Sequence, residues 1–196
     1  VCHSGYLLSP SFGPGLSCLR IQPTASTASV AHHLVSSVFH EFFGVALGKR
    51  LASDGRQVDL IIGNNVYAHV PDITDFTMGL KVLLKPSGTV TLEFPHVKEL
   101  IDYNQFDTVY HEHFSYLSLC TVERIFREAG LRIWDVETLP THGGSLRGYG
   151  CHVEDTRVTT AAVERLRNEE VRFGLETLET YQRFQIQANK VKNDLL

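Results

Sequence analysis

Two short runs of consecutive apolar residues dominate the hydrophobic pattern of this chain. They are VDLIIG at Val58–Gly63 and TVTLEF at Thr89–Phe94, and such runs are typical of parallel strands buried on both faces. A helical stretch at Val45–Ser53 precedes the first run. Between the runs, Asp72 predicts the N-cap of a helix whose apolar positions are Phe76, Leu80, Leu83 and Leu84. Helix and strand therefore alternate along the chain.

The next part of the pattern ends in a hairpin. A helix is predicted over Thr121–Ala129, closed by Gly130. Strands at Leu131–Leu139 and Leu146–Val153 flank a glycine turn, and their spacing predicts antiparallel pairing. The predicted fold class is α/β, a Rossmann-like and mostly parallel sheet wound on both faces, with an antiparallel C-terminal hairpin.

Helical periodicity resumes after the hairpin and continues to the last residue. Thr159–Leu196 is predicted to form one long helix, because apolar residues recur along it at helical spacing, namely Val163, Leu166, Leu175, Leu178 and Tyr181. The resulting apolar stripe either stays exposed or pairs with another copy of the chain. Self-association through this helix is thus one predicted partner interaction.

Composition and charge narrow the range of partners. The chain has 196 residues, of which 43% are hydrophobic and 20% charged, as in an ordinary soluble globular domain. The net charge of -4 and the pI near 6.2 indicate no nucleic-acid partner, and the apolar runs are too short to span a membrane. A cytoplasmic location is expected, because the N-terminus also has no basic segment followed by an apolar stretch. The four widely spaced cysteines indicate no zinc site and no disulfide framework. Because the sequence opens on Val1, we expect a fragment of a longer reading frame.

The stretch Asn104–Ser118 concentrates groups that can move protons. Its sequence, NQFDTVYHEHFSYLS, places Tyr110, His111, Glu112 and His113 after a predicted strand, where scaffolds commonly carry their chemistry. Histidine titrates near neutrality and serves as a general base, and a neighbouring carboxylate can orient its ring. A solvated surface loop is the alternative, and for His111 it is the preferred interpretation.

Both predicted strands lead into polar residues. Asn64, Asn65 and His69 follow the first strand. His96 follows the second, ahead of the histidine loop. Since ligands bind beyond the carboxyl ends of the strands in such sheets, these residues are expected to face one crevice. The HEH string, completed by His69 or His142, also allows a metal-dependent hydrolase or isomerase, but no HExxH helix or cysteine partner accompanies it and no metal is predicted.

Four long motifs of unusual composition stand in order between about Pro23 and Asp155: GNNVYAHVPDITDF, LLKPSGTVTLEFPH, NQFDTVYHEHFSYLS and ETLPTHGGSLR. They resemble motifs of the S-adenosylmethionine-dependent C-methyltransferases that act on nucleotide-linked keto-deoxysugars. The resemblance implies a class I methyltransferase core at residues 1–155, with S-adenosylmethionine as cofactor. Residues 156–196 are then expected to form a helical extension leading toward a C-terminal domain. That domain and the family's N-terminal zinc module are expected to lie outside this fragment.

The resemblance also implies a reaction. A dTDP-4-keto-6-deoxysugar loses the proton at C3, beside its carbonyl, and the enolate attacks the methyl carbon of the cofactor. His113 matches the favoured base, while Tyr110, Glu112 and His69 match residues around the reacting sugar. We expect Glu112 to orient His113 or to bind the sugar. Tyr110 and His69 are expected to donate to the 4-keto oxygen, because such a weak carbon acid needs enolate stabilisation as well as a base.

Further substrate contacts are expected from Asn104 in the histidine loop and from the THGGS turn. The resemblance places this turn beside the active site, which makes His142 and Ser145 candidates for binding the sugar. A purely structural tight turn is the alternative interpretation.

The cofactor is expected to contact residues that follow the first strands, namely Gly5, Gln22, Glu41, Phe42, Asn64 and Asn65. Here the chain departs from the family. It has CHSGYLL at Cys2–Leu8 where the family has approximately SNDGYLL, and Gln22 stands where an acidic residue would hold the ribose hydroxyls. A neutral amide accepts hydrogen bonds more weakly than a carboxylate does. A non-catalytic remnant that binds no cofactor is therefore the competing interpretation.

Overall fold

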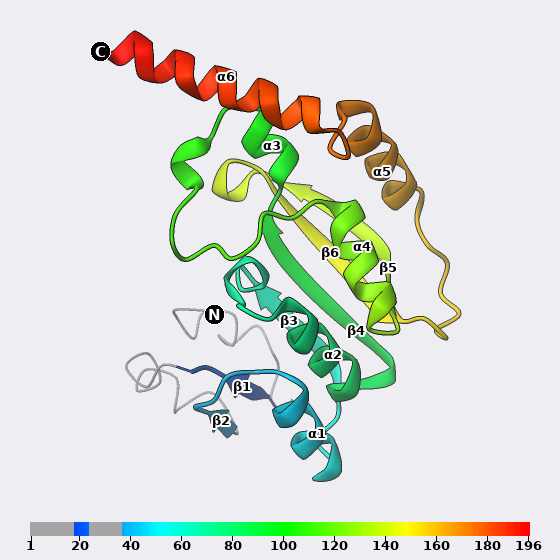
Figure 1. Ribbon diagram of the computed structural model, residues 1–196. Coiled ribbons are helices and arrows are strands. Elements are labelled where there is room, and N and C mark those ends of the chain that lie inside the picture. The colour runs from blue at the N-terminus through cyan, green and yellow to red at the C-terminus, as the bar shows by residue number, and fades with distance from the viewer. Residues whose placement is uncertain (1–17, 24–36) are drawn as a thin grey trace.

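The computed structural model describes residues 18–23 and 37–196 (Figure 1). Its strands are β1 (Leu19–Ile21), β2 (Ser37–Phe39), β3 (Val58–Asn64), β4 (Leu84–Pro95), β5 (Leu131–Leu139) and β6 (Ser145–His152). The central sheet has the order β3-β4-β6-β5, while β1 and β2 form a separate parallel pair. β3 and β4 are parallel, and β6 pairs antiparallel with both β4 and β5. The predicted α/β fold with its C-terminal hairpin is confirmed, and the central sheet is mixed.

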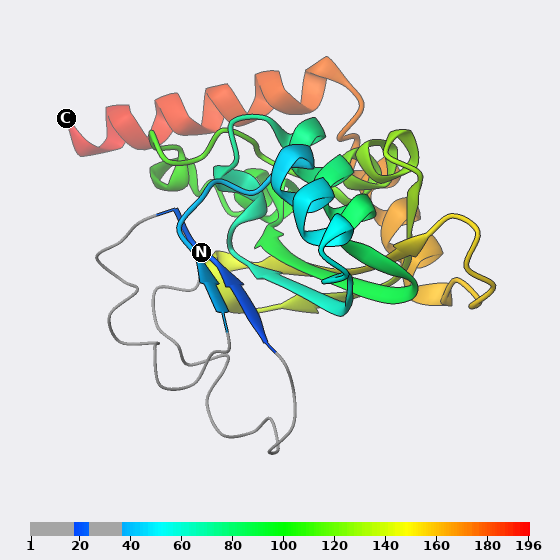
Figure 2. The same cartoon turned by 90° about the horizontal axis from the view of Figure 1, so that it is seen from below.

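Three helices lie on one side of the central sheet (Figure 2): α1 (Val45–Ser53), α2 (Ile73–Leu83) and α4 (Leu119–Glu128). The predicted cap of α2 is confirmed, because the Asp72 carboxylate accepts a hydrogen bond from the Asp75 N–H at 2.8 Å. Ser118 caps α4 in the same way, with its hydroxyl accepting from the Thr121 N–H at 3.1 Å. The helix predicted at Val45–Ser53 matches α1.

The other face of β3 is open in the part of the chain that the structure describes. Leu60 is 47% exposed and Ile62 is 41% exposed, although their run is continuously apolar. The prediction that this strand is buried on both faces is therefore wrong. Alternate side chains of a strand point to opposite faces, and β3 is an edge strand whose packed face alone meets the helices.

Tyr67 anchors the short helix η3 (Tyr67–His69) in the core. Its ring is fully buried and lies within 6.4 Å, between centroids, of the rings of Phe76, Phe94 and Phe126. The Tyr67 hydroxyl lies 2.7 Å from the Thr77 hydroxyl, which satisfies a polar group that would be costly to bury alone. Burial raises the pKa of Tyr67. This anchor fixes the position of His69 two residues later.

The C-terminal segment contains two helices, α5 (Ala161–Phe173) and α6 (Leu178–Leu195). A long final helix is present, but the prediction of one uninterrupted helix over Thr159–Leu196 is wrong. Gly174 adopts a left-handed conformation with φ of 89° and ends α5, as glycine commonly does at helix C-termini. Val163 and Leu166 of α5 are buried in the main core. None of the helices in residues 18–23 and 37–196 combines the length and apolarity needed to cross a membrane.

Candidate active site

Two histidines from distant segments form the centre of the site. His69 ends η3, whereas His113 lies in the loop after η4 (Phe106–Thr108), and their ring centroids are 4.7 Å apart. The Tyr110 hydroxyl lies 3.1 Å from Nε2 of His113. Nδ1 of His69 lies 2.8 Å from the backbone carbonyl oxygen of Glu112. The fold thus brings together His69, Tyr110 and His113, which the sequence places 44 positions apart at the extremes.

The surroundings of His113 favour its neutral form. Burial lowers the pKa of the ring below its ordinary value of 6.5, and the neighbouring charges of His69 and His142 act in the same direction. A hydrogen bond with the Thr108 backbone and the charge of Glu112 oppose this shift without reversing it. A neutral imidazole keeps one nitrogen lone pair. His113 is therefore able to accept a proton near neutral pH, as a general base must.

Glu112 and His111 present their side chains to solvent. The hydrogen bond that Glu112 makes within the cluster uses its backbone carbonyl, which accepts from Nδ1 of His69. Its carboxylate is exposed, and its expected role, to orient His113 or to bind a substrate, stays a prediction. His111 is likewise exposed, consistent with a solvated side chain.

A cavity of about 160 Å³ opens beside His113. Its wall comes from the end of β3, the segment after β4 and the THGGS turn, and it includes Asn65, His96, Gln105, Tyr110, His113 and His142. Asn64 is the last residue of β3, directly before Asn65. The cavity lies beyond the carboxyl ends of the parallel pair β3 and β4, where open α/β sheets bind ligands.

Left-handed backbone conformations gather around this cavity. Within residues 18–23 and 37–196 the non-glycine residues with positive φ are Asn65 (50°), Asn104 (54°) and His142 (53°). Asn65 and His142 line the cavity, and Asn104 immediately precedes Gln105, which also does. The amide Oδ1 atoms of Asn65 and Asn104 are buried without a hydrogen-bond partner among the described residues. Backbone strain and unused buried acceptors are both typical of functional sites.

The THGGS turn is held against the histidine loop and the sheet. Its helical turn is η5 (Thr141–Gly143), and the Gln105 side chain donates to the Gly143 carbonyl at 2.8 Å. The Ser145 hydroxyl donates to the Thr141 carbonyl at 2.9 Å, so it closes the turn. The Thr141 hydroxyl donates at 2.9 Å to the buried carboxylate of Glu93. His142 therefore lines the cavity from a turn that these hydrogen bonds hold in place.

The residues expected to bind the cofactor are placed as follows. Gln22 is buried directly after β1. Glu41 is exposed and forms an ion pair with Arg50, which occupies its carboxylate. The ring of Phe42 is 81% exposed and is therefore free to stack on a ligand. Gly5 lies outside the described residues.

Several polar residues at the site are absent from the sequence prediction of binding or catalytic groups. Glu93 accepts hydrogen bonds from Thr141 and from Arg147, the latter at 2.9 Å. Gln105 joins the loop to the turn. A signal existed for Glu93, which lies at the end of an apolar strand where a buried charge needs partners. Among the described residues, no three His, Cys, Asp or Glu side chains are arranged to hold one metal ion.

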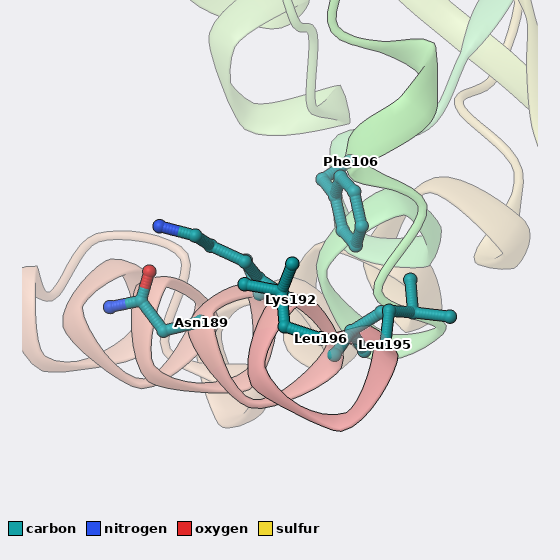
Figure 3. A pocket seen from close by; sticks show the side chains of 7 residues that line it. Phe106, Asn189, Lys192, Leu195 and Leu196 are labelled. Carbon is teal, nitrogen blue, oxygen red and sulfur yellow. The ribbon is translucent and has the colours of Figure 1, made fainter.

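A second, larger hollow lies away from the histidines, between the end of α6 and the Phe106 ring (Figure 3). Its volume is about 540 Å³, and its wall is largely apolar, with Lys192 as its one ionisable side chain. This hollow lacks the groups that acid–base chemistry requires. The smaller cavity at His113 is accordingly the candidate active site.

The fold is that of a class I methyltransferase. An S-adenosylmethionine-dependent methyltransferase from Anabaena variabilis is similar with a TM-score of 0.54 and 13% identity, over 69% of this chain and 68% of that one. The magnesium protoporphyrin IX methyltransferase of Synechocystis PCC 6803, solved with bound SAH, is similar with a TM-score of 0.53 and 13% identity, over 70% and 65% of the two chains. At these identities the likeness concerns the fold alone.

Family models narrow the class. A methyltransferase domain model matches residues 17–136, and a C-methyltransferase C-terminal domain model matches residues 140–196. The chain belongs to the C-methyltransferase family. C-methyltransferase NovU from Streptomyces niveus is 33% identical over 172 residues, which cover 88% of this chain. The matched part spans 41% of that relative's length. The resemblance to C-methyltransferases inferred from the four motifs is thereby confirmed.

Proposed function

We propose that this chain is the catalytic core of an S-adenosylmethionine-dependent C-methyltransferase that methylates C3 of a nucleotide-linked 4-keto-deoxysugar. The observation that carries the proposal is the position of the His113 ring, in a cavity with polar lining residues and against Tyr110 and His69. The family matches and the C-methyltransferase relative support transfer to carbon. The resemblance of the four sequence motifs supports a nucleotide-linked keto-deoxysugar as the substrate.

Asn65 in the cavity wall and two residues outside it, Gln22 and Phe42, offer contacts that fit a bound cofactor. The buried, unpartnered Oδ1 of Asn65 offers an acceptor at the end of β3, and the exposed Phe42 ring offers a stacking surface. Gln22 would meet the ribose hydroxyls as a neutral amide. When bound, S-adenosylmethionine supplies an electrophilic methyl group. The chain's own residues must then generate and protect a carbon nucleophile.

His113 is assigned as the base. Its neutral ring takes the C3 proton of the sugar, and the electron pair of the broken C–H bond moves into the enolate, whose oxygen is the former 4-keto oxygen. A cofactor held by Asn65 and Phe42 would supply its methyl group to the enolate carbon, and its sulfur would keep the electrons of the sulfur–methyl bond. The proton stays on His113 until solvent removes it. The Tyr110 hydroxyl lies 3.1 Å from Nε2 of His113, so the sugar must displace that contact.

Tyr110 is a better donor to the enolate oxygen than His69. The carbonyl of Glu112 can only accept, so the 2.8 Å contact places a hydrogen on Nδ1 of His69. With its hydrogen on Nδ1, a neutral His69 ring has no hydrogen on Nε2 to donate. The Tyr110 hydroxyl carries a hydrogen that it can donate. We therefore assign enolate stabilisation to Tyr110 and a conditional role to His69.

The test is exchange of the C3 hydrogen for deuterium, followed in D₂O with the nucleotide-linked ketosugar. His113→Asn is expected to slow exchange and methyl transfer by roughly 100-fold to 10,000-fold, the usual contribution of a general base. Its affinity for S-adenosylmethionine should stay unchanged. His111→Asn is the matched control, because it removes an exposed histidine from the same loop. Retained exchange in His113→Asn would remove His113 as the base.

A cofactor-deficient core is the second candidate, favoured by Ser4 and Gln22 at positions that are acidic in the family. Titration calorimetry with S-adenosylmethionine separates the two candidates. Micromolar binding supports the enzyme, whereas no detectable heat supports a core that has lost its cofactor. Gln22→Glu combined with Ser4→Asp should tighten binding, since a carboxylate accepts hydroxyl hydrogen bonds with charge assistance. Unchanged affinity would contradict this account of the cofactor loop.

A further inference from the structure

Segment 97–117 leaves the sheet after β4 and returns at the start of α4, so that its two ends meet. The Val97 N–H donates to the Leu117 carbonyl at 3.0 Å, and His96 and Leu117 form an isolated parallel bridge. Between these ends lie the short helix α3 (Val97–Asp102), η4 and the loop that carries His113. Figure 1 shows this long excursion beside the sheet. We call these two ends, residues 96–97 and 117–120, the neck of the segment. The position of the loop depends on how the two ends are held together.

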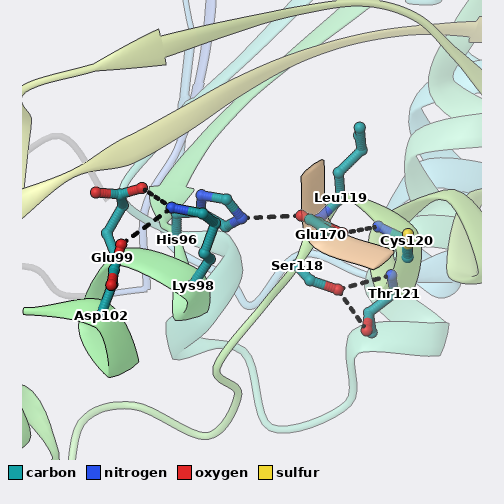
Figure 4. Close-up of polar contacts among 9 residues, drawn as sticks. All are labelled: His96, Lys98, Glu99, Asp102, Ser118, Leu119, Cys120, Thr121 and Glu170. Atoms are coloured by element: carbon teal, nitrogen blue, oxygen red, sulfur yellow. Dashed lines mark hydrogen bonds and ion pairs between the residues drawn. The ribbon is translucent and has the colours of Figure 1, made fainter. Parts of the chain in front are cut away.

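One carboxylate from the C-terminal helices spans the neck (Figure 4). Glu170 of α5 accepts through Oε1 from Nε2 of His96 at 2.8 Å and from the Leu119 N–H at 2.6 Å. Its Oε2 accepts from the Cys120 N–H at 2.9 Å. His96 precedes the segment, and the two N–H groups follow it. Glu170 therefore bonds to both ends of the excursion.

The three bonds account for groups that would otherwise be unsatisfied. The first N–H groups of a helix have no partner within it, and in α4 Glu170 takes those of Leu119 and Cys120 while Ser118 takes that of Thr121. A negative charge is favourable at this positive end of the helix. The Glu170 side chain is 1% exposed and that of His96 is 2% exposed. A charge so deeply buried persists only when it is paired.

The protonation of Glu170 agrees with this arrangement. Burial alone raises its pKa, but the hydrogen bonds from His96 and from the backbone of Cys120 and Leu119 outweigh it and hold the pKa below its ordinary value. An ionised carboxylate only accepts, so Nε2 of His96 carries the hydrogen of their shared bond. The His96 ring is thereby fixed in orientation within the cavity wall.

We propose that Glu170 is a positioning residue for the reaction at His113: it closes the neck of segment 97–117 and fixes His96 in the cavity wall. Helix α5 then belongs to the catalytic unit. This inference rests on the proposed function for its kinetic consequence, but its structural consequence stands apart. Loss of the Glu170 bonds should let the loop move while the residues expected to bind cofactor, none of which belongs to segment 97–117, stay in place.

Glu170→Gln tests the proposal with little change in shape. The amide NH₂ that replaces one oxygen faces a donor, so at least one of the three bonds fails. Glu164→Gln is the matched control, because Glu164 is an exposed residue of the same helix. Amide hydrogen exchange of the full chain should accelerate selectively within 97–118 in Glu170→Gln. The kcat for methyl transfer should fall by about 100-fold, the loss that a small misplacement of catalytic groups can cause, with S-adenosylmethionine affinity unchanged.

His96→Gln provides a second variant, because a glutamine amide still donates to Glu170. It should retain the bonds to α4 and lower kcat less than Glu170→Gln does. Unchanged exchange and unchanged kcat in Glu170→Gln would overturn the proposal. So would faster exchange across the whole chain together with normal kcat in His96→Gln, since that pattern indicates a role in stability alone. If the unsubstituted protein transfers no methyl group, faster amide exchange confined to 97–118 in Glu170→Gln still establishes that Glu170 holds the two ends of the segment together. Only the proposed function then fails.

Discussion

Replacing Gly143 by alanine should loosen the THGGS turn from the histidine loop. Gly143 has φ of 76°, a left-handed conformation that disfavours alanine by about 1 to 2 kcal/mol. A Cβ atom there would lie 2.7 Å from both amide atoms of Gln105. Gln105 must then move, and its 2.8 Å hydrogen bond to the Gly143 carbonyl, worth about 1 kcal/mol, is lost. We expect Gly143→Ala to lower the free energy of unfolding by about 2 to 3 kcal/mol.

Gly55→Ala is the matched control for this experiment. Gly55 has φ of 70°, but a Cβ added to it meets nothing within 4 Å, so the backbone strain stands alone. Thermal denaturation distinguishes the two, because 1 kcal/mol shifts Tm by roughly 2 to 4 °C in a chain of this size. In a Gln105→Ala background, Gly143→Ala should destabilise no more than Gly55→Ala does. Equal destabilisation of the two glycine variants, unaffected by Gln105→Ala, would refute the reasoning.

Two other expectations concern pH and assembly. The C3 exchange rate should fall as pH drops through the pKa of His113, because a protonated ring cannot accept the proton. This acid limb of the pH–rate profile should lie below pH 6.5, since burial and the charges of His69 and His142 lower the pKa of His113. His69→Asn removes one of these charges, so the acid limb of the profile should move to higher pH. An unmoved acid limb would contradict the assignment of His113 as the base. Since α6 exposes Leu178 and Ile186, we expect self-association that Ile186→Asp weakens in sedimentation experiments, whereas a monomer at every concentration contradicts it.

Elements marked by local chemistry are predictable from the sequence. Asp72 is a short acceptor placed just before apolar residues at helical spacing, and it caps α2 as expected. The hairpin of β5 and β6 follows from two strand patterns around a glycine turn. The break between α5 and α6 does not follow, because the apolar periodicity continues across Gly174. A single glycine decides this boundary through its left-handed backbone.

The candidate site is only partly predictable for a different reason. Tyr110, His113 and Asn65 stand out because polar residues follow predicted strands, and they line one cavity. The bond between His96 and Glu170 joins residues 74 positions apart, and Glu170 lies within an ordinary amphipathic helix pattern. Nothing in that pattern separates a buried glutamate from its exposed neighbours. Such pairings are decided by how α5 packs on the core, which local sequence does not encode.

The positions of backbone strain give an independent reason to place a ligand at this cavity. Asn65, Asn104 and His142 have positive φ, a left-handed backbone conformation that glycine adopts without strain. A side chain at such a position adds strain, and all three residues carry polar side chains. Two of them also bury an amide oxygen without a partner among the described residues. Each feature alone destabilises the fold. Asn65 shows both features and lines the cavity, which is explained if its side chain contacts a bound molecule, because that contact would offset both penalties at once.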